Sequence, residues 1–350
     1  MSHRVLHVVE SLTGVLSSVL AMVEVTPDLD HHLAVWPLRS HADTGDDLAP
    51  FTTVTTLARQ PIHAVGDLRQ LVRRLAPDRL HAHSSYAGVV SRVVDPGVEV
   101  VYSPHCFAFE RRDAGRAAND LARRVERALV RRTSVLVACS PHEAGLAREL
   151  GHRDVVTVPN RPLDRPLDRP DVRARFALPL RVVAAGRLCP QKDWRYLLTV
   201  KGYLEEVLGG RVEWEWLGGG DPVAEDALRA RDVHVTGWMP RTDVVKRLAE
   251  AQVFVHTAAW EGAPISILEA TSVGLPVAAR GIPTLVSLGV PGTTPTAADL
   301  AGRILALADP DAWAAEQRRS LLFAAAHSPE LQEERLRTAY RLARAELVLS

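Results

Sequence analysis

The stretch VFVHTAAWEGAPISILEA, Val253 to Ala270, contains a strand, a turn and a helix in direct succession, and it indicates the fold class of the chain. The run Val253–His256 is apolar and β-branched, as a buried strand is. Gly262 permits a sharp turn, and Pro264 suits the first helical turn, where its missing N–H costs no hydrogen bond. Glu261 falls in the loop between the two. The stretch therefore predicts one strand-to-helix step of a parallel α/β sheet.

The same alternation of short β-branched runs and longer amphipathic segments extends through the rest of the chain. The predicted strands are Val5–Val9, Leu33–Pro37, Arg79–His83, Val98–Tyr102, Ser134–Ala138, Val155–Val158, Arg181–Ala185, Val212–Leu217, Val233–Thr236, Val253–His256 and Pro276–Ala279. Helical patterns such as Val65–Leu75 and Ala117–Arg131 separate most of them. Alternation of this kind predicts parallel sheets with helices on both faces.

A tandem repeat rich in proline and charge, RPLDRPLDRP (Arg161 to Pro170), interrupts this pattern. It cannot propagate a helix or form a central strand, so we interpret it as an interdomain linker. The chain has 350 residues, which is long for one core and comfortable for two. We therefore expect two doubly wound domains, residues 1–165 and 166–328, facing each other across a cleft. Ligands of such sheets bind beyond the carboxyl ends of the strands.

The composition excludes several classes of protein. The formal net charge is zero at pH 7, so the chain lacks the electrostatic footprint of a nucleic-acid-binding protein. Cys106, Cys139 and Cys189 form no close pair, which argues against a disulfide scaffold or a zinc site and fits a reducing compartment. No apolar run has the length that a membrane-spanning helix needs. We therefore expect a cytoplasmic protein that binds no nucleic acid.

Cationic side chains follow the first strand of the second half, in AAGRLCPQKDW (Ala184 to Trp194). Gly186 lets the backbone approach a ligand closely. Arg187 supplies a planar fork of donors and Lys192 a point charge, and both suit phosphate oxygens. From the spacing alone, a phosphate site and a solvated loop with surface cations are equally open interpretations.

Two further loops present backbone N–H groups. WLGGGDP (Trp216 to Pro222) places three glycines after a strand, where free amides could face an anion, although tight turns use the same residues. The segment Gly262–Ile265 opens a helix, and its unpaired amides form a positive end that could receive phosphate. On the alternative interpretation, Glu269 is a helix-surface carboxylate and Glu261 makes only a favourable contact with the helix dipole.

In this order and spacing, GRLCPQK, LGGGDP, VTGWMP and EGAPISILEA resemble the C-terminal half of glycosyltransferase family 4, whose members are retaining enzymes of the GT-B fold. The family's pattern of two glutamates separated by seven residues matches Glu261 and Glu269. Its Gly-Arg-Leu with a downstream lysine matches Gly186–Leu188 and Lys192. The N-terminal half resembles bacterial capsular polysaccharide transferases more loosely, through HVVESLTGV, HAHSSYAGVVSRV, VYSPHCFAFE and TVPN.

The chain departs from the family pattern at three places. The first glycine-rich loop of the family carries two or three consecutive glycines, whereas here only Gly14 remains. The family usually continues Pro-Asn with glycine, whereas Arg161 and Pro162 follow Asn160 here. Thr284 stands after Gly-Ile-Pro, where the family often has glutamate. These departures concern the hinge and the acceptor side, and they leave the diphosphate motifs intact.

The resemblance implies a role for each matched residue. Arg187 and Lys192 would stabilise the leaving diphosphate, Glu261 would accept hydrogen bonds from the donor sugar, and Glu269 would hold the ribose diol. His105 would contact the donor sugar from the opposite domain; a packing histidine is the alternative. The catalytic residues are thus His105, Arg187, Lys192 and Glu261, and the donor-binding residues are Gly14, Gly186, Gly219, Gly237, Gly262, Ala263, Pro264, Ile265 and Glu269. The resemblance implies no metal and no cofactor.

The implied reaction is transfer of a hexose-type sugar from a nucleoside-diphosphate sugar to an acceptor hydroxyl, with retained anomeric configuration. A UDP-sugar is favoured over a GDP-sugar, and the acceptor is a polysaccharide, a lipid-linked glycan or a natural product. The resemblance also implies that residues 329–350 form a helix that packs back on the N-terminal domain. Two alternatives stay open: a non-catalytic nucleotide-sugar-binding protein, and a nucleotide-sugar epimerase, a class that lacks the two-glutamate context.

The most basic stretch is ERRDAGRAANDLARRVERALVRR, Glu110 to Arg132. On a helical wheel, Leu121, Val125 and Leu129 share one face. The opposite face carries Arg112, Arg116, Arg123, Arg127 and Arg131. The simpler interpretation is a solvated helix that packs its leucines on the domain. The alternative is a peripheral contact with anionic lipid at the inner membrane face, or with a phosphate-bearing acceptor.

Overall fold

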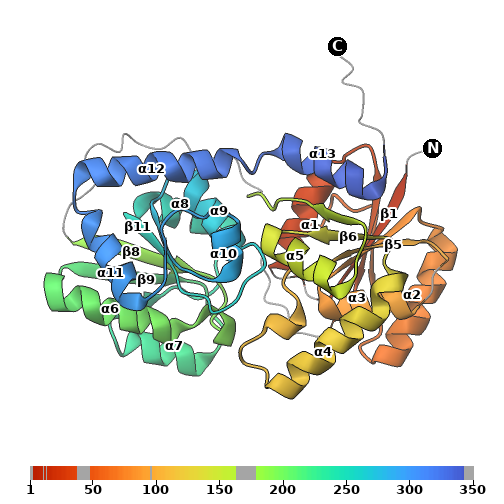
Figure 1. Ribbon diagram of the computed structural model, residues 1–350, viewed down its shortest axis with the longest axis horizontal. Helices are drawn as coiled ribbons and strands as arrows, with labels where there is room; N and C mark the ends of the chain where they lie inside the picture. The colour runs from red at the N-terminus through yellow and green to blue at the C-terminus, as the bar shows by residue number, and fades with distance from the viewer. Residues whose placement is uncertain are drawn as a thin grey trace, which may run out of the picture. The chain divides into compact units, whose positions relative to one another are not determined.

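A computed structural model describes residues 3–10, 12, 14–37, 48–94, 97–162 and 179–342 (Figure 1). The chain forms two compact units. The first comprises Met1–Leu163 and Ser328–Ser350, and the second comprises Asp164–His327. The predicted domain boundary at residues 165 and 166, and the predicted linker from residue 163 onward, lie outside the described residues. None of the helices in the described ranges is both long enough and apolar enough to cross a membrane.

The first unit is built on a seven-stranded parallel sheet. Its strands are β1 (Arg4–Val9), β2 (Asp30–Val35), β3 (Thr53–Thr56), β4 (Arg79–His83), β5 (Glu99–Ser103), β6 (Val135–Ala138) and β7 (Val155–Thr157). They lie in the order β3-β2-β1-β4-β5-β6-β7. The chain thus reverses its direction of travel across the sheet between β1 and β4, the place where α/β sheets open a crevice for ligands.

Helices cover both faces of this sheet, as Figure 1 shows. They are α1 (Val15–Glu24), α2 (Pro61–Leu75), α3 (Ser85–Val93), α4 (Arg116–Leu129), α5 (Pro141–Leu150) and α13 (Pro329–Tyr340). Leu68 of α2 and Val90 of α3 pack against Leu6 and Leu80 on one face. Met22 of α1 packs with side chains of β1, β5, β6 and α13 on the other face. The buried apolar side chains of two sheet faces therefore form the core of this unit.

The last described helix, α13, belongs to the first unit although the second unit precedes it in sequence. Its buried Leu336, Ala339 and Tyr340 join the core beside β6 and β7. Arg161, which replaces the glycine of the family pattern, is also buried there. Its guanidinium donates to Gln332 of α13 at 3.1 Å and pairs with Glu24 of α1 at 2.5 Å. The substituted turn therefore ties α13 to α1.

The second unit repeats the design with a six-stranded parallel sheet in the order β10-β9-β8-β11-β12-β13. Its strands are β8 (Leu180–Ala185), β9 (Val212–Leu217), β10 (Val233–Val235), β11 (Val253–His256), β12 (Val277–Arg280) and β13 (Thr293–Thr294). Its helices are α6 (Trp194–Leu208), α7 (Pro222–Arg229), α8 (Arg241–Glu250), α9 (Ile265–Ser272), α10 (Pro283–Ser287), α11 (Ala297–Ala306) and α12 (Pro310–Ala325). The direction reverses between β8 and β11.

The predicted fold class of two doubly wound α/β domains is confirmed, and each strand predicted from the sequence exists with shifts of a few residues at its ends. Two edge strands were not predicted. β3 is a polar, mostly exposed strand, and β13 has only two residues, so neither carries the apolar run by which a buried strand is recognised. Both strands lie at the edge of their sheet.

The predicted packing of the leucine face of α4 is wrong for Leu121, whereas Val125 and Leu129 are half-buried. Leu121 is 63% exposed, and the buried side chain of the helix is Glu126 instead. Glu126 pairs with Arg92 at 2.8 Å and accepts a hydrogen bond from Tyr102 at 2.8 Å. A buried ion pair took the place of the apolar stripe because the neighbouring helix α3 presents an arginine to α4, which periodicity along α4 alone does not reveal.

Candidate functional site

In the second unit, the charged site residues Arg187, Lys192 and Glu261 follow β8 and β11, the two neighbouring strands at the reversal point (Figure 1), whereas Gly219 and Gly237 follow β9 and β10. The loop after β8 carries Gly186, Arg187 and Lys192, and the loop after β11 carries Glu261. Parallel neighbours end at the same edge of a sheet, so these two loops meet although they lie far apart in the sequence.

A buried ion pair joins the two loops. Lys192 Nζ lies 2.7 Å from Glu261 Oε1, and the two side chains are only 16% and 9% exposed. Gln191 Nε2 donates to the other oxygen, Glu261 Oε2, at 3.2 Å. His256, at the end of β11, places its Nε2 3.6 Å from Glu261 Oε1. The carboxylate is therefore surrounded by three side chains, and Gln191 and His256 were not recognised from the sequence.

These neighbours keep Glu261 charged. Burial by itself would raise the pKa of Glu261, but the charge of Lys192 and the contact with His256 outweigh it and lower that pKa to about 2. Burial lowers the pKa of His256 below its ordinary value, against the opposing influence of Glu261. At neutral pH the site thus holds an ionised acceptor beside a cation and a neutral imidazole.

Several hydrogen bonds fix the backbone on either side of this pair. Thr257 donates to the carbonyl of Lys192 at 2.7 Å. Thr284, the threonine that replaces the family's glutamate, donates to the carbonyl of Glu261 at 2.7 Å. Asp193 caps α6 and pairs with Arg280 at 2.7 Å. The departure at Thr284 therefore supports the loop that carries Glu261.

Gly186 and Arg187 have different roles in the loop that follows β8, which we call the β8 loop. Gly186 has a φ of 132°, and a Cβ there would lie 2.7 Å from Cε of Lys192, so only glycine leaves room for the lysine. Arg187 is partly buried, and no hydrogen bond or ion pair joins it to any described residue. Of the two predicted phosphate-binding cations, one is held by Glu261 and the other is available to a ligand.

The three glycines after β9 pack against this loop and do not present a row of free amides. A Cβ on Gly218 would lie 2.5 Å from the Gly186 carbonyl oxygen, and one on Gly220 would lie 2.4 Å from that of Leu188. The amide of Gly218 donates to Thr236 at 3.1 Å, and that of Gly220 donates to Glu225 at 2.9 Å. Of the two uses that the sequence left open for the triplet, Gly218 and Gly220 therefore serve the tight turn.

The other predicted glycines of this loop cluster lie together. The Cβ position of Gly219 is 3.3 Å from Cα of Gly237, and Gly218 and Gly237 form an isolated antiparallel bridge. Gly237 has a φ of 72°, a conformation that glycine adopts without strain. The structure thus brings Gly186, Gly219 and Gly237 to the same edge of the sheet.

The segment Gly262–Ile265, with Ala263 and Pro264 between, leads into α9. The helix begins at Ile265 with Pro264 as its N-cap, and no side chain caps it. The helix end thus carries the partial positive charge that a phosphate favours. Glu269, buried in the same helix, pairs with Arg241 at 2.8 Å. Arg241 opens α8 and was not recognised, because its partner lies in a different helix.

His105 and Gly14 belong to the first unit. Gly14 precedes α1 with a φ of 56°, and a Cβ there would meet no described atom within 4 Å. His105 follows β5 with a φ of 51°, and Cys106 follows with 87°, so two consecutive non-glycine residues are left-handed. Such strain persists only where the surroundings enforce it, and it clusters at functional sites.

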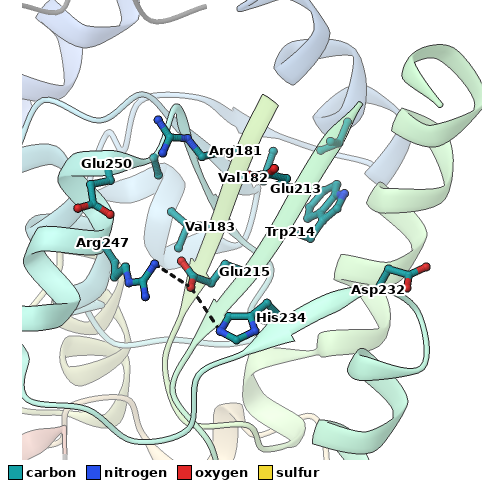
Figure 2. A pocket seen from close by; sticks show the side chains of 12 residues that line it. Arg181, Val182, Val183, Glu213, Trp214, Glu215, Asp232, His234, Arg247 and Glu250 are labelled. Atoms are coloured by element: carbon teal, nitrogen blue, oxygen red, sulfur yellow. Dashed lines mark ion pairs between the residues drawn. The ribbon is translucent and has the colours of Figure 1, made fainter. Parts of the chain in front are cut away.

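A pocket in the second unit lies away from these residues. Figure 2 shows that it is lined by side chains from β8, β9, β10 and α8, with Glu215 between His234 and Arg247. The ion pairs are loose, at 3.8 Å and 3.7 Å. The lining residues of β8, Arg181 to Val183, come from the first half of that strand. Ligands of parallel sheets bind at the other end of the strands, so this pocket is not the candidate site.

Comparison with protein families gives two matches. The family model described as glycosyl transferases group 1 matches residues 179–321, and the glycosyl transferase 4-like domain matches residues 13–161. The two models together span both units, and the first contains all the residues of the Lys192–Glu261 site.

The chain is also similar to individual proteins over most of its length. An uncharacterized 41.2 kDa protein in the cps region of Klebsiella pneumoniae is 21% identical over 82% of this chain and 84% of the relative. The UDP-Gal:alpha-D-GlcNAc-diphosphoundecaprenol alpha-1,3-galactosyltransferase of Escherichia coli is 25% identical over 76% of this chain and 75% of the relative. The structure of Anabaena Alr3699/HepE in complex with UDP-glucose superposes with a TM-score of 0.78, at 18% identity over 97% of this chain and 100% of the other. This last likeness shows the GT-B fold.

Proposed function

Since the chain belongs to the group 1 glycosyltransferases and is of the GT-B type, we propose that it transfers a hexose from a nucleoside-diphosphate sugar with retention of anomeric configuration. The observation that carries the proposal is the buried Lys192–Glu261 pair at the reversal point of the second sheet, near Arg187, which forms no hydrogen bond or ion pair with a described residue. This arrangement offers both charges that such a donor requires, a cation for the diphosphate and a carboxylate for sugar hydroxyls.

The chemistry follows from where charge develops. As the bond to the anomeric carbon breaks, negative charge grows on the leaving diphosphate, and fixed cations placed there stabilise the transition state. We assign this role to Arg187 and Lys192, together with the N-terminal end of α9. These groups balance the diphosphate charge, and we therefore propose that transfer needs no metal ion and no cofactor.

Glu261 and Glu269 are not proposed as an acid and nucleophile pair. The pKa of Glu261, lowered to about 2, suits a permanent hydrogen-bond acceptor and not a proton donor. Glu269 is held by Arg241 in a separate ion pair. We propose that Glu261 accepts from the donor sugar, that Glu269 accepts from the ribose, and that the leaving phosphate takes the proton of the attacking hydroxyl.

The donor and acceptor classes draw support from the relatives. The galactosyltransferase of Escherichia coli is named for a UDP-sugar donor and a diphosphoundecaprenol-linked acceptor, and the HepE structure holds UDP-glucose. We propose a UDP-sugar in preference to a GDP-sugar, and a lipid-linked glycan of polysaccharide assembly as acceptor, at the cytoplasmic face of the membrane.

The proposed function is tested by assaying the purified chain with UDP- and GDP-sugars and a diphosphopolyprenol-linked sugar acceptor, with and without EDTA. We expect transfer from a UDP-hexose that EDTA leaves unchanged, and proton NMR of the product should show the anomeric configuration of the donor. An inverted product would refute retention. Donor binding without turnover on any acceptor would favour the non-catalytic alternative instead.

We also propose that the solvent face of α4 contacts anionic lipid. Arg124 and Arg127 of α4, Arg131 of the following turn (Val130–Arg132) and Leu121 are all exposed, so the helix presents both cations and an apolar side chain to solvent. Each cation contributes about 1 kcal/mol near an anionic surface. Changing the three arginines to glutamate is therefore expected to abolish co-sedimentation with phosphatidylglycerol vesicles and to spare donor binding. Unchanged co-sedimentation would exclude this face.

A further inference from the structure

Four histidines of the first unit form a continuous chain of hydrogen bonds that ends at His105. His31 Nδ1 lies 3.0 Å from His7 Nε2, and His7 Nδ1 lies 3.0 Å from His83 Nε2. His83 Nδ1 in turn lies 3.1 Å from His105 Nε2. The rings of His81 and His83 lie side by side, with centroids 4.0 Å apart. His31, His7 and His83 come from β2, β1 and β4, three adjacent strands, and His105 follows β5.

The far end of this chain fixes the direction of every hydrogen bond in it. His31 Nε2 lies 3.0 Å from the carbonyl oxygen of Thr26, which can only accept, so Nε2 of His31 carries the hydrogen. The Thr26 hydroxyl, 3.1 Å from the same nitrogen, donates to the carbonyl of Met22 and therefore also accepts from His31. The polarity of the chain is thus set by a backbone group that cannot change it.

Each ring in the chain carries one hydrogen, because burial keeps the imidazoles neutral. Burial lowers the pKa of His7 and of His83 well below the ordinary histidine value, and it lowers that of His105 to about 4. His31 is shifted in the same direction by burial. A neutral imidazole that accepts at one nitrogen donates at the other.

This alternation of donor and acceptor nitrogens along the chain determines the tautomer of His105. With hydrogen on Nε2 of His31, its Nδ1 accepts from Nε2 of His7, and the same step repeats through His83. Nε2 of His105 must therefore carry the hydrogen and donate to His83, which leaves Nδ1 of His105 as an acceptor. Within the described ranges, no residue forms a hydrogen bond with that Nδ1.

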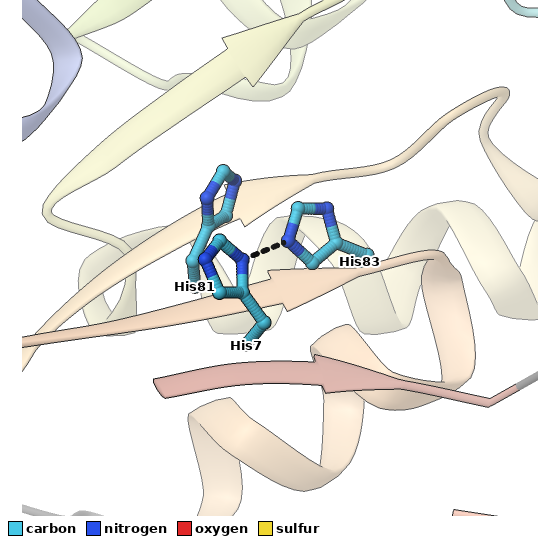
Figure 3. Close-up of side chains that lie close together, drawn as sticks. All are labelled: His7, His81 and His83. Atoms are coloured by element: carbon cyan, nitrogen blue, oxygen red, sulfur yellow. Dashed lines mark hydrogen bonds between the residues drawn. The ribbon is translucent and has the colours of Figure 1, made fainter. Parts of the chain in front are cut away.

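The three rings in Figure 3 could instead suggest a metal site, because one nitrogen from each of His7, His81 and His83 lies within 4.8 Å of the others. All six ring nitrogens are already used, however. Both nitrogens of His7 and of His83 serve the chain. His81 bonds to the hydroxyl of Tyr340 and to that of Ser103, each at 2.8 Å. A metal ion would have to break several of these bonds, so the cluster fits a relay of hydrogen bonds better than a ligand set.

The backbone also holds His105 in place. The left-handed Cys106 donates its amide to the buried carboxylate of Glu143 at 2.7 Å, and Cys139 at the end of β6 donates to the other oxygen at 2.8 Å. This carboxylate anchors the loop that the strained residues form. The loop position and the ring tautomer are therefore both determined by buried groups behind the site.

We propose that His31, His7 and His83 are positioning residues that fix His105 as the Nε2–H tautomer, so that its Nδ1 is presented as a hydrogen-bond acceptor for a substrate hydroxyl. The proposal deepens the proposed function and rests on it for the identity of the hydroxyl. The tautomer itself follows from the hydrogen-bond chain alone. His31, His7 and His83 act only through His105 and touch no substrate.

The first test is ¹⁵N NMR of the histidine ring nitrogens in the ligand-free chain, with His105 assigned by comparison with His105→Gln. We expect hydrogen on Nε2 of His105, with a single tautomer from pH 7 to pH 8. Hydrogen on Nδ1 would overturn the proposal. This measurement needs no turnover, so it separates failure of the relay from failure of the proposed transferase function.

The second test removes His7, the ring to which His83 donates, and compares the result with a matched variant. His7→Leu removes the acceptor for His83, and we expect a mixture of His105 tautomers and about a tenfold loss of kcat/KM with the UDP-hexose that the wild type uses. His81→Leu removes an equally buried ring outside the chain, so we expect it to keep the wild-type tautomer and most of the activity. Equal effects of both variants would show a packing role only and overturn the proposal.

A zinc titration provides the third test. Isothermal calorimetry of the full chain with Zn²⁺ should show no stoichiometric binding that His81→Leu or His7→Leu removes. Stoichiometric binding lost in both variants would mean that the rings ligate a metal ion, and the relay would be refuted.

Discussion

Lys192→Ala is expected to lower kcat/KM for the donor sugar by about a thousandfold, since removing one fixed stabiliser of transition-state charge costs about 10² to 10³ in rate. Lys192 is one of the two cations assigned to the leaving diphosphate, and it also compensates the buried charge of Glu261 at 2.7 Å. Its loss therefore affects both transition-state charge and the position of the carboxylate. Steady-state kinetics with the UDP-hexose that the wild type uses measures the effect.

The same substitution also affects stability, and the two consequences must be separated. Leaving a buried carboxylate unpaired costs about 3 to 5 kcal/mol of unfolding free energy. The double variant Lys192→Met with Glu261→Gln removes both charges, so we expect it to recover most of the stability and none of the activity. Urea unfolding followed by circular dichroism compares the unfolding free energies of the single and double variants.

Lys201 offers a matched control in the same unit. It is also a buried lysine, 4% exposed, and it pairs with Glu205 within α6. Lys201→Ala is expected to reduce stability and leave kcat/KM of the folded fraction near the wild-type value. Full activity in folded Lys192→Ala would refute our assignment of the diphosphate site to this loop.

Acidification from pH 7 to pH 5 is expected to unfold the first unit. Burial holds the pKa values of His7, His81 and His83 well below the ordinary histidine value. Between the unfolded pKa of about 6.5 and these lower folded values, the unfolded chain binds more protons. The unfolding free energy therefore falls as the pH falls, by about 1.4 kcal/mol per pH unit for each such proton.

Three protons give a slope of about 4 kcal/mol per pH unit once the unfolded histidines are charged, and a whole domain has only about 5 to 15 kcal/mol of stability. His105 and His152, with pKa values lowered to about 4 mainly by burial, act in the same direction. Hydrogen exchange with mass spectrometry at stepped pH should locate the loss of protection in the strands of the first unit.

Removing one cluster histidine should weaken this dependence. His81→Leu is expected to reduce the slope by about 1.4 kcal/mol per pH unit, whereas His63→Gln, at an exposed position of α2, should leave it unchanged. Unfolding free energies that stay level between pH 7 and pH 5 would contradict the prediction, because they would mean that the cluster is already protonated or accessible in the folded chain.

Motif spacing in the sequence predicted part of the candidate site. Gly186, Lys192 and Glu261 were each identified from residues within one loop, and the structure brings them to one edge of the sheet. The use of the glycine triplet stayed open in the sequence because glycine serves both close packing and anion binding, and only contacts with the β8 loop distinguish the two uses. Gln191 and His256 carry no motif of their own, and they gain importance only from where Glu261 lies.

The sequence by itself determined the α/β class, the division into two similar halves and the loops that bear the site, because strand and helix periods and turn residues are local properties of the chain. Only the tertiary structure decided which side chains meet. Lys192 pairs with Glu261 across 69 positions, and His7 meets His83 across 76. Both contacts depend on the order in which parallel strands assemble, and that order places β4 beside β1 and β11 beside β8 through long-range burial that no local pattern encodes.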